Sequence, residues 1–237
     1  MDVLMIGVLI LAGGRGQRMG GQDKGWCEYR QKPMIEWVLQ DLNAQRAKLH
    51  QSGQDTVCVI SANRNNARYA ALVDAVVSDI NPGYLGPLSG IEAALQWGAL
   101  QLNLGISRWI TCPVDSMALP TDYLQRMSAL HERTLGFAQY LSNDLQKPEK
   151  PQSPQSYFAH MSLPSHSLNA LQMYTAQNRE QNHALKTASS VLNTAHSSGS
   201  IYQWLRQEKA QPIVFNDKQK FLNINELEGF GKGIYSA

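Results

Sequence analysis

A run of glycines and basic residues near the N-terminus carries the clearest chemical signal in the chain. The segment Gly13–Gly25 follows the apolar stretch Val8–Leu11 directly and contains Arg15, Arg18 and Lys24. Glycine lets a backbone approach a ligand closely, and consecutive backbone N–H groups can point at phosphate oxygens. Lysine and arginine add positive charge, and arginine can also bind a phosphate through two N–H groups. The segment is therefore expected to hold a polyphosphate; the alternative is a plain surface turn.

The segment differs from two common phosphate-binding loops. Lys24 follows Asp23, and no Gly-Lys-Ser/Thr sequence occurs, so the segment is not a Walker A loop. Met19 stands where a dinucleotide-binding loop that starts at Gly14 would need its third glycine.

Two carboxylates follow apolar stretches farther along the chain. Asp115 comes shortly after Trp109–Cys112, and a lone carboxylate there suits Mg²⁺, which takes one or two carboxylates together with substrate phosphates. The alternative role for Asp115 is to cap a helix near Pro120. Asp79 follows Ala75–Val77 and either accepts hydrogen bonds from a ribose or base or caps a turn at Asn81.

The elements that must position these residues alternate between apolar, strand-like runs and helical patterns. The runs are Val8–Leu11, Thr56–Ile60, Ala75–Val77 and Trp109–Cys112. Helical patterns follow Pro33, occupy Ile91–Leu102 after a loop over 81–90, and follow Pro120. Such alternation predicts an α/β fold with a mostly parallel central sheet, and residues 1–135 are interpreted as a Rossmann-like half. Since ligands bind beyond the carboxyl ends of parallel strands, the loops after Leu11, Ile60, Val77 and Cys112 are expected to share one crevice.

The second half of the chain gives a weaker pattern. Strands are expected at Phe137–Leu141, Tyr157–Met161 and Pro212–Phe215, and helices at Leu168–Thr175 and Ile201–Arg206. The stretch 142–156 contains three prolines and is expected to form a loop. The stretch 176–200, rich in Ser, Asn, Gln and His, is expected to be partly disordered. No linker separates the halves, so residues 1–237 are predicted to form a single domain.

Composition excludes several classes of protein. With 21 basic and 19 acidic residues, the net charge of +2 argues against a nucleic-acid binder. No stretch reaches the ~18 apolar residues that a membrane helix needs, so no membrane contact is expected. The three cysteines, Cys27, Cys58 and Cys112, form no CxxC pair and are expected to be reduced thiols of a cytoplasmic protein. The six histidines show no metal-ligand spacing and are interpreted as surface or core residues.

Several short motifs together resemble the signature of the molybdenum cofactor guanylyltransferases, the MobA family of nucleotidyltransferases. The first is Leu-Ala-Gly-Gly-x-x-x-Arg-Met-Gly-x-x-Asp-Lys-Gly from Leu11 to Gly25. The resemblance continues along nearly the whole chain at Lys32–Ile35, Ala62–Arg64, Gly86–Gly90, Cys112–Asp115 and Asn223–Asn225.

This resemblance implies a three-layer α/β/α nucleotidyltransferase fold. It also implies Mg²⁺-dependent transfer of GMP from GTP to the terminal phosphate of molybdenum-loaded molybdopterin, with release of pyrophosphate. Residues 1–135 would bind the nucleotide and residues 136–237 the acceptor. Transient contact with other proteins that make or receive the cofactor would follow from that role.

The resemblance also implies roles for individual residues. The nucleotide-binding residues would be Leu11, Ala12, Gly13, Gly14, Arg15, Lys24, Ser61, Asp79, Gly90 and Asp115. Lys24 and Arg18, with Asp115, would be the catalytic residues, and Asp115 and Asn225 would bind the metal. The alternative for Asn225 is to cap a helix before Glu226, and the alternative for Gly90 is a plain helix entry with Ser89 as its cap.

Two departures from the family pattern leave other functions open. Ser61 stands where the family usually has Asn, and Ser116-Met117 replaces the usual Thr-Pro after Asp115. The first alternative is another nucleotidyltransferase, specific for molybdopterin and CTP or for a sugar phosphate. The second is an accessory protein that binds a nucleotide or molybdopterin without catalysis.

Overall fold

The computed structural model describes residues 5–13, 22–80, 86–140, 155–188, 200–216 and 221–223. Of the predicted site residues, Gly14, Arg15, Arg18 and Asn225 lie outside these ranges. Most of the predicted loop 142–156 also lies outside them.

The first part of the described chain alternates strands with helices, as the sequence predicts. Its elements are β1 (Met5–Leu11), the 3-10 helix η2 (Lys24–Trp26), β2 (Glu28–Tyr29), β3 (Lys32–Pro33), α1 (Met34–Gln51), β4 (Thr56–Ser61), α2 (Asn66–Ala70), β5 (Ala75–Val77), α3 (Pro87–Leu100), the 3-10 helix η3 (Leu102–Leu104) and β6 (Ile106–Pro113).

The second part adds the remaining strands and helices. They are β7 (Ser116–Met117), α4 (Tyr123–Ser128), β8 (Gly136–Tyr140), β9 (Gln155–Pro164), α5 (Ser167–Ala188), α6 (Ile201–Gln207), β10 (Gln211–Phe215) and β11 (Leu222–Asn223).

One seven-stranded sheet runs through both halves in the order β10-β8-β9-β6-β1-β4-β5. The strands β5, β4, β1 and β6 pair in parallel, which confirms the Rossmann-like half. β9 is antiparallel to both of its neighbours, β6 and β8, while β10 is parallel to β8. The sheet is therefore mostly parallel, and β9 joins the predicted halves without a break.

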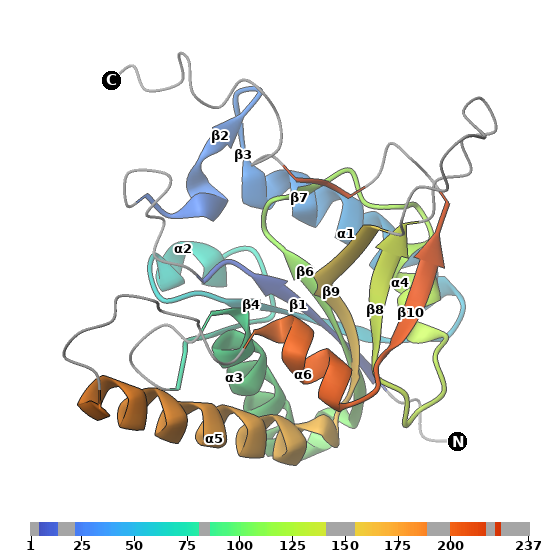
Figure 1. Cartoon of the computed structure of the whole chain (residues 1–237). Coiled ribbons are helices and arrows are strands. Elements are labelled where there is room, and N and C mark those ends of the chain that lie inside the picture. The colour runs from blue at the N-terminus through green and yellow to red at the C-terminus, as the bar shows by residue number, and fades with distance from the viewer. Residues whose placement is uncertain are drawn as a thin grey trace, which may run out of the picture.

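Helices cover both faces of this sheet, as Figure 1 shows, with α1 and α4 on one face and α3, α5 and α6 on the other. The alternation of side chains along β1 explains the two layers. Val8 and Ile10 pack with residues of α1 and α4, whereas Leu9 and Leu11 pack with residues of α3 and β4. A strand buried on both faces must be apolar at every position, and this explains why Val8–Leu11 is a continuous apolar run.

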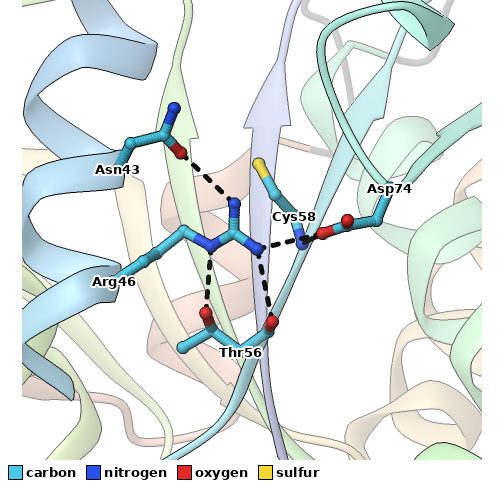
Figure 2. Close-up of polar contacts among 5 residues, drawn as sticks. All are labelled: Asn43, Arg46, Thr56, Cys58 and Asp74. Carbon is cyan, nitrogen blue, oxygen red and sulfur yellow. Dashed lines mark hydrogen bonds and ion pairs between the residues drawn. The ribbon is translucent and has the colours of Figure 1, made fainter. Parts of the chain in front are cut away.

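A side-chain latch ties α1 to β4 and to the residue just before β5 (Figure 2). The Nε of Arg46 donates to Thr56 Oγ1 at 2.9 Å, and its Nη2 lies 3.0 Å from Asp74 Oδ2. The same carboxylate oxygen accepts from the backbone N–H of Cys58 at 2.7 Å. The latch therefore holds the start of β4 and the residue before β5 against α1.

The structure corrects two of the predicted boundaries. α3 begins at Pro87, four residues before the predicted start at Ile91, because Pro87 fits the first turn and Gly86 precedes it with φ of 73°. Gly90 thus lies in the first helical turn and not in a loop. Ser89 is also inside the helix, which has no side-chain cap, so its expected alternative role as the cap is wrong.

The second correction concerns residues 176–200, which were expected to be partly disordered. Helix α5 continues to Ala188, so the first half of this stretch is helical. A polar composition does not prevent a helix when tertiary packing supports it, and α5 packs against α3. Residues 189–199 lie outside the described ranges. No helix in the described part of the chain is long and apolar enough to span a membrane.

Candidate functional site

The site is built where the order of the strands reverses. From β1 the chain moves to β4 and β5 on one side, and α3 then carries it back to β6 on the other side of β1. Ligands of open α/β sheets bind at such a point, beyond the carboxyl ends of the strands. The ends of β1 and β6 stay joined here, because the backbone N–H of Val114 donates to Leu11 O at 3.1 Å.

Lys24 and Asp115 meet at this point, although they lie 91 positions apart in the sequence. The Nζ of Lys24 is 2.5 Å from Asp115 Oδ2. The Lys24 side chain is 25% exposed and that of Asp115 is 9% exposed, so the lysine side chain is the more open to solvent of the two. The pair places a cation and an anion side by side at the end of β6, where the crevice was predicted.

The backbone around Lys24 is fixed by Asp23. Its carboxylate accepts from the backbone N–H of Gly25, from Tyr69 Oη at 2.6 Å and from Asn65 Nδ2 at 2.9 Å. Gly25 has to be a glycine, because a Cβ there would lie 2.3 Å from Tyr69 Oη. Asp23 therefore fixes the backbone around Lys24, although it was not among the predicted site residues.

The turn that follows β6 presents Asp115. The backbone N–H of Met117 donates to Asp115 O at 3.1 Å, and the N–H of Leu119 donates to Asp41 Oδ2 at 2.9 Å. Helix α4 begins later, with Asp122 as its N-cap, so Asp115 does not cap a helix near Pro120. The structure thus removes the main alternative role for Asp115.

A second group of predicted residues gathers at the end of β4. The backbone N–H of Ala12 donates to Ser61 O at 2.9 Å, which holds the end of β1 against β4. A Cβ on Gly90 would lie 2.2 Å from Ser61 Oγ, so the first turn of α3 passes directly over Ser61. Gly13 is less crowded, since the nearest atom to a Cβ there would be Asn63 Nδ2 at 3.6 Å.

Asp79 is held by Asn63, a residue to which the sequence reading gave no role. Asn63 Nδ2 donates to Asp79 Oδ2, and the backbone N–H of Asp79 donates to Asn63 Oδ1, both at 2.9 Å. Burial raises the pKa of the Asp79 carboxyl, and the hydrogen bond from Asn63 partly opposes that rise. The motif Ala62–Arg64 was the sequence signal for this pair.

The donor chemistry of the site suits a magnesium ion held mainly by its substrate. Within the described ranges, no three His, Cys, Asp or Glu side chains gather as a metal site would require. Asp115 instead offers a single, largely buried carboxylate. Mg²⁺ commonly takes one or two protein carboxylates and completes its shell with phosphates and water, so this donor set fits it.

Comparison with known proteins places the chain among nucleotidyltransferases. The model of the MobA-like NTP transferase domain matches residues 8–181, well over half of the chain. The chain belongs to the MobA-like NTP transferase family. The expected resemblance and the expected class of enzyme are thereby confirmed.

Curated relatives carry the name molybdenum cofactor guanylyltransferase. The relative from Polynucleobacter asymbioticus is 30% identical over 220 residues, covering 93% of this chain and 91% of its own length. The relative from Cupriavidus metallidurans is 31% identical over 224 residues, with 93% and 90% coverage. The relative from Shewanella amazonensis is 40% identical over 129 residues, and this match spans 58% of its length and 54% of this chain.

Solved structures of distant proteins share the fold. A 4-diphosphocytidyl-2C-methyl-D-erythritol synthase from Anaerococcus prevotii has a TM-score of 0.60 at 12% identity, covering 96% of this chain and 93% of that protein. A hypothetical transferase from Thermus thermophilus has a TM-score of 0.55 at 16% identity, with 93% and 97% coverage. These likenesses confirm the predicted nucleotidyltransferase fold.

Proposed function

We propose that this chain transfers GMP from GTP to the terminal phosphate of molybdenum-loaded molybdopterin and releases pyrophosphate. The observation that carries the proposal is the contact between Lys24, near the end of the glycine-rich segment, and Asp115, in the turn after β6. Two relatives match this chain over at least 90% of both lengths, and both are named molybdenum cofactor guanylyltransferase. These names support guanine as the base and molybdopterin as the acceptor.

In the proposed reaction an oxygen of the acceptor phosphate attacks the α-phosphorus of GTP. The bond between that phosphorus and the oxygen bridging to the β-phosphate breaks, and pyrophosphate leaves with the electron pair. Catalysis then consists of positioning and charge neutralisation, as in other phosphoryl transfers. The ammonium of Lys24 would move from Asp115 to the phosphates and stabilise the leaving group, together with Arg18.

Asp115, with Asn225, would hold Mg²⁺. The ion would supply positive charge beside the phosphate oxygens. β11 ends two residues before Asn225 and pairs with β7, with Asn223 opposite Ser116. This pairing brings the segment that leads to Asn225 beside the Asp115 turn and supports its proposed role.

The other predicted residues would bind the nucleotide. Leu11, Ala12, Gly13, Gly14 and Arg15 would contact it from the end of β1 and the loop that follows. Ser61, Asp79 and Gly90 would contact the base and ribose from the neighbouring strand ends. Ser61 ends β4, the strand next to β1, and packs closely against Gly90 of α3. This arrangement supports placing both residues in the nucleotide site.

We further propose that residues 1–237 act as one domain, with the nucleotide half at 1–135 and the acceptor half at 136–237. The continuous sheet supports this proposal. The reaction is proposed to take place in the cytoplasm, and the free, buried Cys27, Cys58 and Cys112 suit a reducing compartment. Transient contact with proteins that deliver molybdopterin or receive the product is part of the same proposal.

Incubation with GTP, Mg²⁺ and molybdenum-loaded molybdopterin tests the function. Formation of the guanine dinucleotide product and pyrophosphate is expected, with CTP, ATP and UTP giving far less. Asp115→Ala is expected to abolish Mg²⁺-dependent release of pyrophosphate, and Lys24→Ala to lower the rate by about 10²–10³, the usual effect of losing one such charge-stabilising group. A preference for CTP would instead favour a molybdopterin cytidylyltransferase, and GTP binding without product would favour an accessory protein.

A further inference from the structure

A chain of buried hydrogen bonds starts at the residue next to Asp115. The Oγ of Ser116 lies 2.8 Å from His160 Nε2, and His160 Nδ1 lies 3.0 Å from Tyr123 Oη. Tyr123 Oη in turn donates to the backbone oxygen of Thr111 at 2.6 Å. Ser116, His160 and Tyr123 are each less than 5% exposed, so this series of hydrogen bonds lies inside the protein.

The direction of each hydrogen bond in this series follows from the last acceptor, the backbone oxygen of Thr111. A carbonyl oxygen can only accept, so the hydroxyl hydrogen of Tyr123 points at Thr111 O. Tyr123 Oη must therefore accept from His160 Nδ1–H. Burial lowers the pKa of His160 to about 3, so the ring is neutral at physiological pH, and Nε2 is the acceptor. The hydroxyl of Ser116 consequently donates to His160.

Aromatic rings surround His160 and connect it to the C-terminal part of the sheet. Its ring lies 4.9 Å from Phe221 and 5.5 Å from Tyr123, both edge to face, and 6.2 Å from Tyr157. Phe221 also stacks on Tyr157 at 4.7 Å and contacts Phe215 at 5.1 Å. The ring of His160 is thus enclosed by rings from α4, β9 and the residue before β11, and Phe215 of β10 packs behind two of them.

The Asp115 turn depends on the same neighbours. β11 follows Phe221 directly and pairs with β7, placing Leu222 opposite Met117. The N–H of Phe221 donates to Ala118 O at 3.2 Å, and both residues have positive φ, of 61° and 56°. Since non-glycine residues rarely adopt positive φ, this turn keeps its shape only while its surroundings hold it.

We propose that His160 is a positioning residue that fixes the Asp115 carboxylate through Ser116. Through the ring cluster it also links the acceptor half of the chain to the metal-binding turn. This inference rests on the proposed function, in which Asp115 binds Mg²⁺. It gives a role to Ser116, one of the departures from the family pattern, and to His160, one of six histidines that were expected to be surface or core residues.

Three variants test the positioning role, and a fourth serves as the control. Ser116→Ala removes the donor to His160, and His160→Phe keeps an aromatic ring without either nitrogen. In both, kcat is expected to fall about ten- to a hundred-fold, as for a misplacement of about 1 Å, and the Mg²⁺ concentration for half-maximal rate to rise, with KM for GTP changed much less. Ser116→Thr keeps the hydroxyl and is expected to restore both values.

Ser162→Ala is the matched control. Ser162 lies on the same strand as His160, is fully buried and donates to Met127 O at 2.6 Å, but it has no contact with the Asp115 turn among the described residues. It is expected to lower stability without changing the Mg²⁺ dependence. Equal kinetic effects in Ser162→Ala and Ser116→Ala, or wild-type kinetics in His160→Phe, would overturn the positioning role.

Two measurements remain informative even if the protein shows no transferase activity. They distinguish a failure of the positioning role from a failure of the proposed function. Hydrogen exchange at the Met117 amide is expected to be at least ten-fold faster in Ser116→Ala and His160→Phe, and unchanged in Ser162→Ala. Nitrogen chemical shifts of His160 are expected to show the neutral Nδ1–H tautomer. Unchanged exchange in both variants, or an Nε2–H tautomer, would refute the inference whatever the activity.

Discussion

Gly25 leaves no room for a larger side chain, and a substitution at this one position tests the consequence. A Cβ at this position would overlap Tyr69 Oη, whose hydrogen bond to Asp23 fixes the backbone before Lys24. Gly25→Ala is expected to shift Lys24 and to weaken GTP binding at least ten-fold, while the chain still folds. Isothermal titration calorimetry with GTP and Mg²⁺ measures the effect.

Gly98→Ala is the control for steric overlap alone. A Cβ there would lie 2.6 Å from the Trp109 ring, far along α3 from its first turn. This variant is expected to lose stability and to keep its affinity for GTP. Unchanged GTP affinity in Gly25→Ala would show that the position of Lys24 does not depend on the Asp23–Tyr69 contact.

His160 is expected to make stability depend on pH in acid. Burial lowers its pKa to about 3, below the ordinary value of about 6.5 that applies in the unfolded chain. Between these values the unfolded chain binds the proton and the folded protein does not. The contribution is therefore intact above pH 6.5 and is lost as the pH falls, by up to about 1.4 kcal/mol per pH unit.

Urea unfolding of wild type and His160→Phe at pH 7, 6, 5 and 4 checks this prediction. The free energy of unfolding of the variant is expected to fall less steeply with decreasing pH than that of wild type. Parallel curves would mean that His160 takes up a proton equally well in the folded protein.

At the scale of elements, the Arg46 latch joins α1 to β4 and to the residue before β5 (Figure 2). Arg46→Ala is expected to lower the free energy of unfolding by about 1–2 kcal/mol, mostly through hydrogen bonds, since the half-exposed Asp74 carboxylate adds little as a charge. Arg46→Lys is expected to lose nearly as much, because an ammonium cannot replace the branched guanidinium. Urea midpoints give the measurement.

Arg133→Ala controls for the loss of a surface arginine. Its side chain is 81% exposed and lies 4.0 Å from Glu132, so the change is expected to stay below about 0.5 kcal/mol. An equally small change in Arg46→Ala would show that the latch contributes nothing to stability.

At the scale of the whole molecule, the proposed function predicts a link between ligand binding and unfolding. A ligand at 100 times its Kd stabilises the folded state by about 2.7 kcal/mol. For a chain of this length, GTP with Mg²⁺ is therefore expected to raise Tm by roughly 5–10 °C. Thermal unfolding with GTP alone, and with GTP and Mg²⁺, separates the contribution of the metal.

The Mg²⁺-dependent part of that rise is expected to disappear in Asp115→Asn. The uncharged amide keeps the shape of the side chain but binds Mg²⁺ poorly. If Mg²⁺ raised Tm equally in the variant and in wild type, the metal would not depend on Asp115.

Local patterns were sufficient to predict the strands of the seven-stranded sheet and most helices, but not the two-residue strands β2, β3 and β7. Val8–Leu11 is apolar at every position because β1 is covered on both faces, and that pattern is visible without any structure. The start of α3 and the length of α5 were predicted less well. Helix ends depend on turn geometry and on packing with distant elements, and the part of α5 after Thr175 has the polar composition of a disordered segment.

The sequence by itself determined the α/β class and identified the segment around Lys24 and Asp115 as candidate phosphate and metal ligands, because residue type and strand ends are local properties. Only the tertiary structure decided that Lys24 and Asp115 form a contact pair, that Asn63 holds Asp79 and that His160 lies behind Ser116. These partners are separated by 91, 16 and 44 positions. Such contacts arise from the order and direction of the strands, which no local pattern specifies.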